Sequence, residues 1–382
     1  MTGILHKVVV ASDSFKGCLR SDQVADAVES GVLNVYPDCE VVKIPVGDGG
    51  EGTMEALLAA LSGRKISLQV HDPLGRPVAA EYALLNDDSA IIEISRASGL
   101  TLLADEERNP CKTSTYGTGQ MIADALRRGC RRFWVCIGGS ATNDAGTGML
   151  EALGYRFLDA AGNEVKGCGR ALNKIFQIDS SAVIPELNEA EFTVACDVDS
   201  PLYGPQGAAF VFAPQKGADS AAVAELDRGL RHFADIIRKY TGIDAADFPG
   251  AGAAGGLGSA FKTFLNADLK RGADMVLDAI RFDELIAGAD LVITGEGKID
   301  AQTMCGKLPS AVALRAAAQD IHVLAICGRS EIAAHSLFPD MLHLFRQICP
   351  VTPCGTPMHA ALDPELASLN IARTVETVLA SL

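Results

Sequence analysis

The sequence predicts an α/β protein in which helices cover a mainly parallel sheet, and two observations support this class. The N-terminal region alternates β-branched runs with amphipathic segments in the order strand, helix, strand, helix, as in parallel strands joined by crossover helices. The same alternation returns from about Asp274, after a middle region of short apolar runs and turn residues. A chain of 382 residues is long enough for two domains. We therefore expect one domain made of residues 1–70 and 271–382, with a mixed α/β domain, residues 71–270, inserted in it.

The elements of the first domain follow from apolar runs and their end signals. Residues 7–11 are apolar and β-branched, which predicts a buried strand, and Ser21 is a candidate N-cap for the helix after it. A second strand leads into the glycine loop 47–52, followed by a helix that Gly63 ends. The C-terminal part predicts a strand with its glycine loop, a helix and a further strand, at residues 289–300, 309–320 and 322–328. Ligands of such sheets bind beyond the carboxyl ends of the strands, so these loops are candidate sites.

The middle region has a different pattern. Residues 71–95 alternate short apolar runs with Pro-Leu-Gly and Asn-Asp-Asp turns, which predicts antiparallel hairpins. Residues 133–137 are typical of a buried strand, and the sequence GGSATNDAGTGML that follows combines glycines with helix-capping side chains. The other predicted elements are helices at residues 120–128 and 218–240 and a flexible, glycine-dense loop at residues 249–258.

Composition excludes several classes of function. The formal net charge of -15 argues against nucleic acid or an anionic membrane surface as the main partner. No apolar run is long enough to span a bilayer. The 11 cysteines include no C-x-x-C pair, which favours reduced thiols over structural zinc. A site for an anionic ligand must therefore be built locally, from a few lysines or arginines and from backbone N–H groups.

The loop GDGGEG at residues 47–52 matches the dinucleotide-binding pattern G-x-G-x-x-G. A strand precedes it, a helix follows, and Asp72 stands about where a ribose-binding acid would. Asp48 and Glu51 argue against a pyrophosphate here, because like charges in a desolvated site are costly. A cation or a substrate hydroxyl suits these carboxylates better. A dehydrogenase and a purely structural turn remain as alternatives for this loop.

Other nucleotide and hydrolase motifs have little support. Residues 250–255 also match G-x-G-x-x-G, but no strand leads into them, so a linker is slightly favoured over a phosphate loop. There is no Walker A sequence and no protein-kinase catalytic loop. There is no G-x-S-x-G elbow either, and the histidines are isolated, so nucleophilic hydrolysis has no support.

The remaining pattern is a set of acids in glycine-flanked loops after predicted strands. Each acid alone is a common cap or turn residue, but five such loops are hard to assign to capping alone. Phosphoryl transfer needs carboxylates for Mg²⁺ or for a hydroxyl proton, and cations and N–H groups for phosphates. The acids are Asp13, Asp48 with Glu51, Asp144, Asp197 with Asp199, and Glu296 with Asp300; the lysines in or beside glycine loops are Lys16, Lys112, Lys216, Lys298 and Lys307. This set favours a phosphotransferase without a P-loop.

Several long stretches resemble the bacterial class I glycerate kinases, in the order of that family and over nearly the whole chain. They are SDSFKG at Ser12, PVGDGGEGT at Pro45, STYGTG at Ser114, GGSATNDAGTGML at Gly138, ACDVDSPLYGPQGAAFVFAPQKGA at Ala195, GAGAAGGLG at Gly250 and DLVITGEGKIDAQTMCGK at Asp290. The resemblance implies phosphorylation of D-glycerate by ATP and Mg²⁺ in the cytoplasm, giving 2-phosphoglycerate. It also implies a discontinuous Rossmann-like domain, an inserted second domain and an active site in the cleft between them.

The roles of individual residues are hypotheses within this resemblance. We expect Asp48 or Asp197 to accept the proton of the substrate hydroxyl, with Lys16 as a further catalytic group. The expected substrate-binding residues are Asp13, Ser14, Lys16, Glu51, Thr118 and Lys307. The expected ATP-binding residues are Gly138, Gly139, Ser140, Thr142, Asn143, Asp144, Gly252, Gly255 and Gly256. The expected Mg²⁺ ligands are Asp199, Glu296 and Asp300, with Asp13 as a further candidate.

Three other functions stay open at this point. One is an NAD(P)-dependent hydroxy-acid dehydrogenase that uses the loop 47–52. Another is a glycerate kinase that phosphorylates the 3-hydroxyl. The last is a non-catalytic binding protein for small hydroxy acids. The expected partner is a small molecule, with no nucleic acid and no membrane, and both a monomer and a homodimer fit the sequence.

Overall fold

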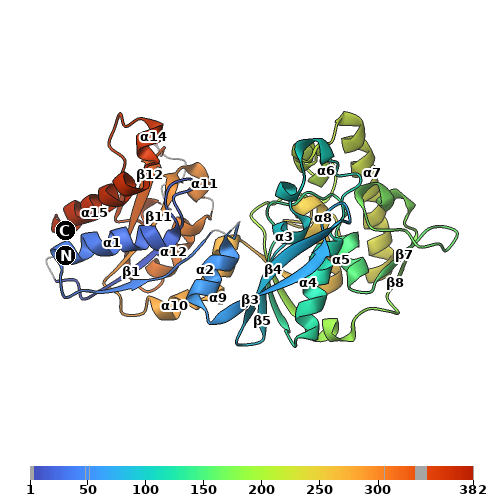
Figure 1. Cartoon of the computed structure of the whole chain (residues 1–382), viewed down its shortest axis with the longest axis horizontal. Helices are drawn as coiled ribbons and strands as arrows, with labels where there is room; N and C mark the ends of the chain where they lie inside the picture. Colours follow the sequence, from blue (N-terminus) through green and yellow to red (C-terminus); the bar gives the residue numbers. More distant parts are fainter. Residues whose placement is uncertain (1–3, 48, 51, 305, 332–341, 382) are drawn as a thin grey trace. The chain divides into compact units, whose positions relative to one another are not determined.

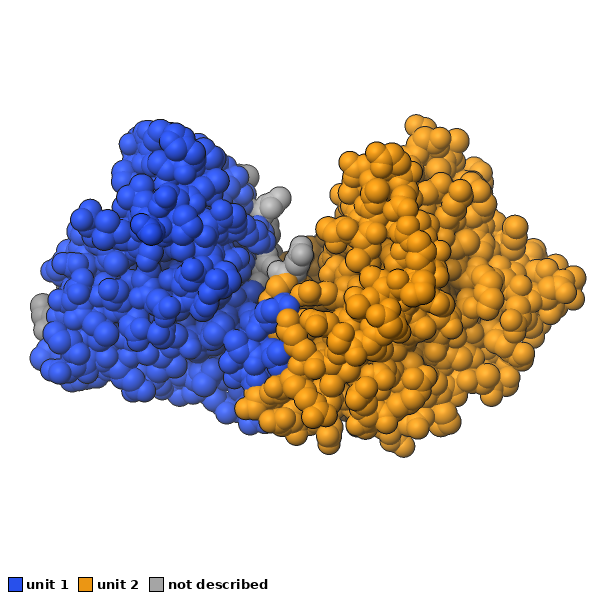
Figure 2. Space-filling view, viewed as in Figure 1, with its two compact units in different colours: residues 1–48, 55–61, 273–382 blue, residues 49–54, 62–272 orange. Residues whose placement is uncertain are grey.

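The chain divides into two compact units in the computed structural model, which describes residues 4–47, 49–50, 52–304, 306–331 and 342–381. Unit 1 comprises Met1–Asp48, Glu55–Leu61 and Ala273–Leu382, and unit 2 comprises Gly49–Met54 and Ser62–Gly272 (Figure 2). The sequence-based boundary at residue 70 falls near the end of a strand, Gly63–His71, that belongs wholly to unit 2. That strand pairs along its full length with the next one, which explains its place in unit 2.

Unit 1 is built on a five-stranded sheet in the order β13-β12-β11-β1-β2. Every pairing in it is parallel. The strands are β1 (Lys7–Ser12), β2 (Glu40–Lys43), β11 (Leu291–Ile299), β12 (His322–Ser330) and β13 (Gln347–Pro350). Because parallel strands all end at the same edge, residues distant in sequence come together beyond Ser12, Ile299, Ser330 and Pro350.

Helices cover both faces of this sheet (Figure 1). The helices α1 (Ser21–Val35) and α15 (Pro364–Ala380) share a core with the sheet, and α12 (Leu308–Ala317) packs on it as well. The other helices of this part of the chain are α2 (Thr53–Ala60), α9 (Gly272–Ala279), α10 (Phe282–Leu285), α11 (Ala301–Met304) and α14 (Met358–Ala361). Val8 and Val10 of β1 share a core with side chains of α1 and α15, whereas the alternate residue Val9 faces the other side and is also fully buried. α12 contacts β11 and β12. The central strand β1 is accordingly an almost continuous apolar run, as expected for a strand with helices on both faces.

Unit 2 contains a mixed six-stranded sheet in the order β10-β9-β6-β5-β4-β3. β5, β6, β9 and β10 are parallel to one another, and β3, β4 and β5 form an antiparallel meander. The strands are β3 (Gly63–His71), β4 (Pro77–Leu85), β5 (Ser89–Glu93), β6 (Arg132–Cys136), β9 (Glu191–Ala195) and β10 (Asp268–Lys270), with a separate hairpin of β7 (Arg156–Leu158) and β8 (Gln177–Asp179). The antiparallel part corresponds to the hairpins that the turn signals predicted.

The helices of unit 2 enclose one large apolar core. They are α3 (Ser95–Ser98), α4 (Tyr116–Arg127), α5 (Thr147–Ala152), α6 (Ala208–Phe212), α7 (Ser220–Thr241) and α8 (Ala253–Leu265), with 3-10 helices at Leu100–Leu102, Asp105–Glu107, Gly169–Lys174, Pro185–Glu189 and Pro214–Lys216. Phe133 of β6 and Phe192 of β9 are register partners whose rings stack at 4.7 Å, and Phe261 of α8 lies 5.9 Å from Phe192. This aromatic contact fixes α8 against the sheet.

The predicted α/β class is confirmed, but the prediction of a flexible loop at residues 249–258 is wrong. Most of that segment is buried, and Ala253–Gly258 forms the start of α8. Ala254, Gly255 and Gly256 have positive φ angles within it. Glycine density was a signal of unusual backbone conformation rather than of flexibility. Among the described residues, no helix is both long enough and apolar enough to cross a bilayer.

Candidate active site

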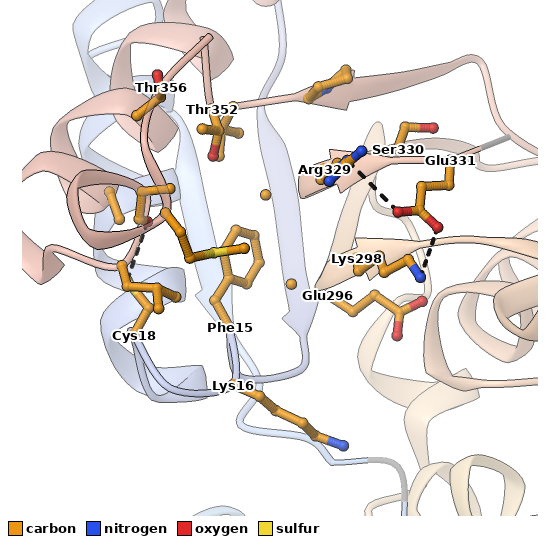
Figure 3. Close-up of a pocket in the computed structure, with 18 of the residues that line it drawn as sticks. Phe15, Lys16, Cys18, Glu296, Lys298, Arg329, Ser330, Glu331, Thr352 and Thr356 are labelled. Atoms are coloured by element: carbon orange, nitrogen blue, oxygen red, sulfur yellow. Dashed lines mark hydrogen bonds and ion pairs between the residues drawn. The ribbon is translucent and has the colours of Figure 1, made fainter. Parts of the chain in front are cut away.

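The carboxyl edge of the unit 1 sheet borders a cavity of about 1090 Å³. Its walls come from the loop after β1, the ends of β11 and β12, and the segment from Pro350 to Ala367 (Figure 3). Lys298 of β11 is the register partner of Arg329 of β12, so these two cations are brought side by side by strand pairing. The predicted site residues Asp13, Ser14, Lys16, Glu296, Asp300 and Lys307 all line this cavity.

Glu296 is the central acid of the cavity, and it is only 8% exposed. The Thr303 hydroxyl donates a hydrogen bond to one of its oxygens, and Lys307 Nζ lies 3.8 Å from the other. Burial raises the pKa of Glu296, and the nearby charges of Asp13 and Asp300 act in the same direction. Thr303 and Lys307 oppose that shift. A carboxylate crowded by other acids in a cavity binds a cation readily, because the cation relieves their repulsion.

Ion pairs connect the other charged side chains of this wall. Lys298 Nζ lies 3.1 Å from Asp300 Oδ2 and 2.7 Å from Glu331 Oε2, and Arg329 Nε lies 3.6 Å from Glu331 Oε1. Arg329 and Glu331 are not among the predicted site residues, because the last predicted strand ends at residue 328, whereas β12 continues to Ser330. The polar segment Arg329-Ser330-Glu331, directly after an apolar run, could have marked these two residues as candidates.

The loop after β1 is fixed to β11. Asp13 N–H donates to Gly295 O at 2.9 Å, and the Ser12 hydroxyl donates to the same oxygen at 3.0 Å. Asp13 itself is buried and accepts a hydrogen bond from Ser14 N–H at 2.7 Å. Figure 3 shows the Phe15 ring turned into the cavity, with Lys16 extending from the same loop in the opposite direction. The short loop thus presents an acid, an aromatic ring and a cation within four residues, Asp13 to Lys16.

The loop 137–146 of unit 2 follows β6 at the carboxyl edge of its own sheet, and Asp144 holds it together. The Asp144 carboxylate is fully buried and accepts hydrogen bonds from Thr115 N–H and Oγ1–H, both at 2.8 Å. It also accepts from Gly146 N–H at 3.1 Å and Gly148 N–H at 3.2 Å. Asp144 is predicted to bind ATP, but its carboxylate oxygens already accept hydrogen bonds from the protein itself.

Lys216 lies beneath the same loop, and it is only 2% exposed. Its Nζ donates to Ser140 Oγ and to Thr142 O, both at 2.7 Å. Burial lowers the pKa of Lys216 to about 7, and the charge of Asp144 acts in the opposite direction. The sequence marked Lys216 as one lysine beside a glycine loop, but its burial could not be read from the pattern. Gly138 and Gly139, by contrast, are exposed.

Two side chains of this loop carry polar atoms that the described structure leaves without a hydrogen-bond partner. They are the Thr142 hydroxyl and both amide atoms of Asn143, in residues with no exposed surface. Unpartnered buried polar atoms are costly, which marks them as candidates for contact with water or a ligand. Thr142 and Asn143 stay predictions for phosphate binding.

The predicted ATP-binding glycines of α8 contact protein backbone closely. A Cβ on Gly255 would lie 2.1 Å from Thr142 O, and a Cβ on Gly256 would lie 2.9 Å from the Cα of Ala145. A Cβ on Gly252 would lie 2.2 Å from Pro201 O. Ala145 N–H also donates to Gly255 O at 3.0 Å. These glycines are therefore needed for the contact between α8 and neighbouring loops.

Thr118, which is predicted to bind substrate, lies in the first turn of α4. α4 begins at Tyr116, so the STYGTG motif enters the helix, and the fully buried Thr118 hydroxyl is 2.7 Å from Ser98 Oγ. Gly117 and Gly119 fit the same packing role, since Cβ atoms there would lie 2.0 Å from His71 O and 2.3 Å from Met149 O.

Asp197 and Asp199 follow β9 and are both exposed. Asp197 Oδ1 accepts a hydrogen bond from Gly272 N–H at 2.8 Å, which orients the carboxylate.

Glu93, at the end of β5, was not predicted as a site residue. It is 1% exposed and accepts hydrogen bonds from the N–H groups of Gly52 and Met54, both at 3.0 Å. The sequence pattern that could have identified Glu93 is an acid at the last position of an apolar strand. Asp48 and Glu51 lie outside the described residues.

Asp72 is explained by its own hairpin. Its Oδ1 accepts from Leu74 N–H and Arg76 N–H, each at 2.8 Å, and its Oδ2 is 2.6 Å from Arg76 Nε. A ribose-binding role would have to displace these contacts, so the acid that supported a dehydrogenase has a structural function in the β3–β4 turn.

The described residues contain no cluster of three or more His, Cys, Asp or Glu side chains arranged to hold a metal ion. Glu296 and Asp300 belong to unit 1, and Asp199 belongs to unit 2. Mg²⁺ is commonly bound by one or two carboxylates together with waters and substrate phosphates, rather than by an all-protein cage. Glu296 and Asp300, which influence each other electrostatically, fit that mode.

An α/β fold with acids, lysines and an arginine at the carboxyl edge of a parallel sheet is the architecture of enzymes that bind small anionic ligands. The chain belongs to the glycerate kinase family, whose model matches residues 8–382. It is 44% identical to a glycerate kinase of Bacillus subtilis (strain 168) over 377 residues, covering 98% of this chain and 97% of that protein.

Two further relatives support the assignment. A glycerate 2-kinase of Escherichia coli (strain K12) is 46% identical over 323 residues, which are 84% of this chain and 85% of that protein. A solved crystal structure named for glycerate kinase 2 of Salmonella typhimurium LT2 matches with a TM-score of 0.87 at 41% identity. That match covers 99% of this chain and 98% of the other.

Proposed function

We propose that this protein transfers the terminal phosphoryl group of ATP to the 2-hydroxyl of D-glycerate, with Mg²⁺, giving 2-phosphoglycerate and ADP. Membership of the glycerate kinase family supports the substrate, and the E. coli relative carries the name glycerate 2-kinase. The observation that carries the reaction type is the cluster of Glu296, Asp300 and Lys307 in one cavity at the carboxyl edge of a parallel sheet.

Phosphoryl transfer depends mainly on positioning and on neutralising charge, because the transferring group bears its charge on several oxygens. Glu296 and Asp300 would hold Mg²⁺, which supplies positive charge at the phosphate oxygens. Lys307 and Lys16 would pair with the carboxylate of glycerate or with the transferring group. Lys307 directly precedes α12, so the N–H groups of that helix's first turn add favourable potential for an anion.

Asp197 is the proposed proton acceptor for the substrate hydroxyl. It follows a parallel strand, is exposed, and is oriented by the hydrogen bond from Gly272 N–H. An ionised aspartate within hydrogen-bond reach of an alcohol can take its proton as the new O–P bond forms. Asp48 remains the second candidate for this role. Exclusion of water around the bound substrates would prevent hydrolysis of ATP from competing with transfer.

The test is ADP release from ATP and Mg²⁺, with and without D-glycerate, followed by phosphorus NMR of the product. We expect ADP only when glycerate is present, and a phosphate on the 2-hydroxyl. A phosphate on the 3-hydroxyl would correct the regiochemistry and keep the kinase. Binding of glycerate without ADP release would favour a binding protein. Reduction of NAD by a hydroxy acid, with no ADP, would replace the kinase by a dehydrogenase.

A further inference from the structure

The cavity of unit 1 is much larger than glycerate requires. Its volume of about 1090 Å³ slightly exceeds the range of ~300–1,000 Å³ typical for pockets that enclose drug-sized ligands. Glycerate is a three-carbon acid and would fill a small part of it. The size therefore calls for a ligand with several connected parts.

The two sides of the cavity differ in chemistry. Its lining includes the apolar side chains of Phe15, Val351, Met358 and Leu362, and also Lys298 and Arg329 with their acidic partners. Figure 3 shows Phe15, Cys18, Thr352 and Thr356 on one side and Glu296, Lys298, Arg329 and Glu331 on the other. A ligand that satisfies both sides has a flat apolar end and a multiply anionic end.

The apolar side also exposes large side chains to solvent. Met358 is 68% exposed and Leu362 is 41% exposed, although both line the cavity. Single exposed apolar side chains are common, but adjacent ones that line a cavity are typical of a ligand-binding site. Phe15 is only 5% exposed and belongs to the core of unit 1, so Met358 and Leu362 supply the accessible apolar surface of the cavity.

We propose that this cavity is the nucleotide site of the enzyme, with the purine ring against the exposed side chains of Met358 and Leu362 and the phosphates against Lys298 and Arg329. This proposal rests on the proposed kinase function and names the place of its nucleotide. It differs from the expectation that Gly252, Gly255 and Gly256 bind ATP, because a Cβ at each position would lie 2.1–2.9 Å from a neighbouring backbone atom, and close packing accounts for these glycines.

The ion pairs around Glu331 make the charged side adjustable. Glu331 Oε2 lies 2.7 Å from Lys298 Nζ, and its Oε1 lies 3.6 Å from Arg329 Nε. Phosphate oxygens would replace the Glu331 carboxylate as the partner of Lys298 and Arg329, and a guanidinium group can bind two oxygens of one phosphate. Glu331 therefore competes with the nucleotide. Its replacement by glutamine should tighten nucleotide binding, which an ordinary surface ion pair would not do.

The first measurement is calorimetric binding of the non-hydrolysable analogue β,γ-imido-ATP, with Mg²⁺, to the full-length chain. We expect Met358→Glu to weaken binding at least about tenfold, and Arg329→Met to do the same, while Glu331→Gln tightens it about threefold. Leu314→Glu is the matched control: Leu314 is 50% exposed on α12 of the same unit and does not line the cavity. Unchanged binding in Met358→Glu and Arg329→Met would overturn the proposal.

Photolabelling with 8-azido-ADP, followed by peptide mapping, is the second measurement. We expect label within residues 350–362. Label within residues 138–146 or 250–258, with glycerate-dependent ADP release intact, would overturn this nucleotide site and leave the kinase function standing. Label within residues 350–362 without any ADP release would support the nucleotide site and contradict the kinase. Failure of the wild-type chain to bind nucleotide or to release ADP would overturn both.

Discussion

The carboxyl edges of the two sheets differ in how their charged side chains are satisfied. In unit 1, Glu296 borders a cavity, and Lys298 is half exposed between Asp300 and Glu331. In unit 2, Asp144 has no exposed surface and accepts four hydrogen bonds from its own loop and from Thr115. Lys216 is likewise buried and donates to the loop above it. At both edges a strand is followed by a loop that contains glycines and an acid. One edge leaves room for a ligand, whereas the other uses its polar groups to fix the loop.

A glycine-flanked acid after a strand thus has two physically distinct uses in this protein. Where neighbouring backbone fills the space, the acid caps N–H groups and the glycines permit contact. Where the neighbouring loops diverge, the acid faces a cavity. Substitutions at matched positions of the two edges should therefore divide into effects on stability and effects on turnover.

The largest effect on stability is expected from Asp144→Ala. The change leaves the N–H groups of Gly146 and Gly148 and both donors of Thr115 without their acceptor in a dry interior. The free energy of unfolding should fall by about 3–5 kcal/mol. Urea denaturation measures this, with Asp235→Ala, an exposed position on α7, as the control. A loss no larger than in the control would mean that Asp144 is not a structural residue.

The largest effect on turnover is expected from Glu296→Gln. The variant keeps an acceptor for Thr303 but loses the negative charge for Mg²⁺, so kcat should fall by about 100-fold, or ~2.7 kcal/mol in the barrier. The melting temperature should change little. Glu284→Gln, exposed on α10, should match the wild type. Full activity in Glu296→Gln would remove this acid from the site.

The pH profile offers a second test of Glu296. Because burial raises its pKa above the ordinary 4.5, the rate should fall with decreasing pH through a pKa above that value, where the carboxylate is lost. The residual activity of Glu296→Gln should lack this acidic limb. An acidic limb at the same pH in both proteins would assign it to another group.

A smaller effect, specific in its pH dependence, is expected from Lys216→Met. The native pKa of Lys216 is about 7 and its ordinary value is 10.5, so between these pH values the unfolded chain binds a proton that the native protein does not. Wild-type stability should therefore rise with pH through this window, relative to the variant, by at most ~1.4 kcal/mol per pH unit. Denaturation of both proteins at pH 7, 8, 9 and 10 gives the difference. A difference that does not vary with pH would show that Lys216 has an ordinary pKa.

The smallest effect is expected from Lys298→Met, the unit 1 counterpart of the Lys216 substitution. Lys298 is about half exposed, so its ion pairs with Asp300 and Glu331 are screened by water and salt. The melting temperature should stay within about 2 °C of the wild type at physiological ionic strength. A fall as large as that of Lys216→Met would contradict the contrast between the two edges.

Much of the fold could be predicted from the sequence because strand and helix signals are local. The strand predicted at residues 133–137 is β6 (Arg132–Cys136), and the helix predicted at 218–240 is α7 (Ser220–Thr241). The errors came where glycine has a tertiary role. Residues 249–258 were expected to be flexible, because local patterns cannot tell a glycine that frees the backbone from one that lets backbones touch.

The candidate site was predicted less evenly. Asp13, Glu296, Asp300 and Lys307 were singled out by motif and do line one cavity, since parallel strands bring their carboxyl ends together. Arg329 and Glu331 were missed, and so was the apolar wall around Met358. No sequence period marks a cavity wall, because its members come from separate elements.

By itself, the sequence determined the α/β class, the order of strands and helices and the family, because these depend on residue patterns that are contiguous in the chain. Only the tertiary structure decided which polar residues are buried. Asp144 and Lys216 are satisfied inside unit 2, whereas Glu296 and Lys298 face a cavity in unit 1. The physical reason is that desolvation depends on every element that surrounds a side chain, and that environment exists only after the chain has folded.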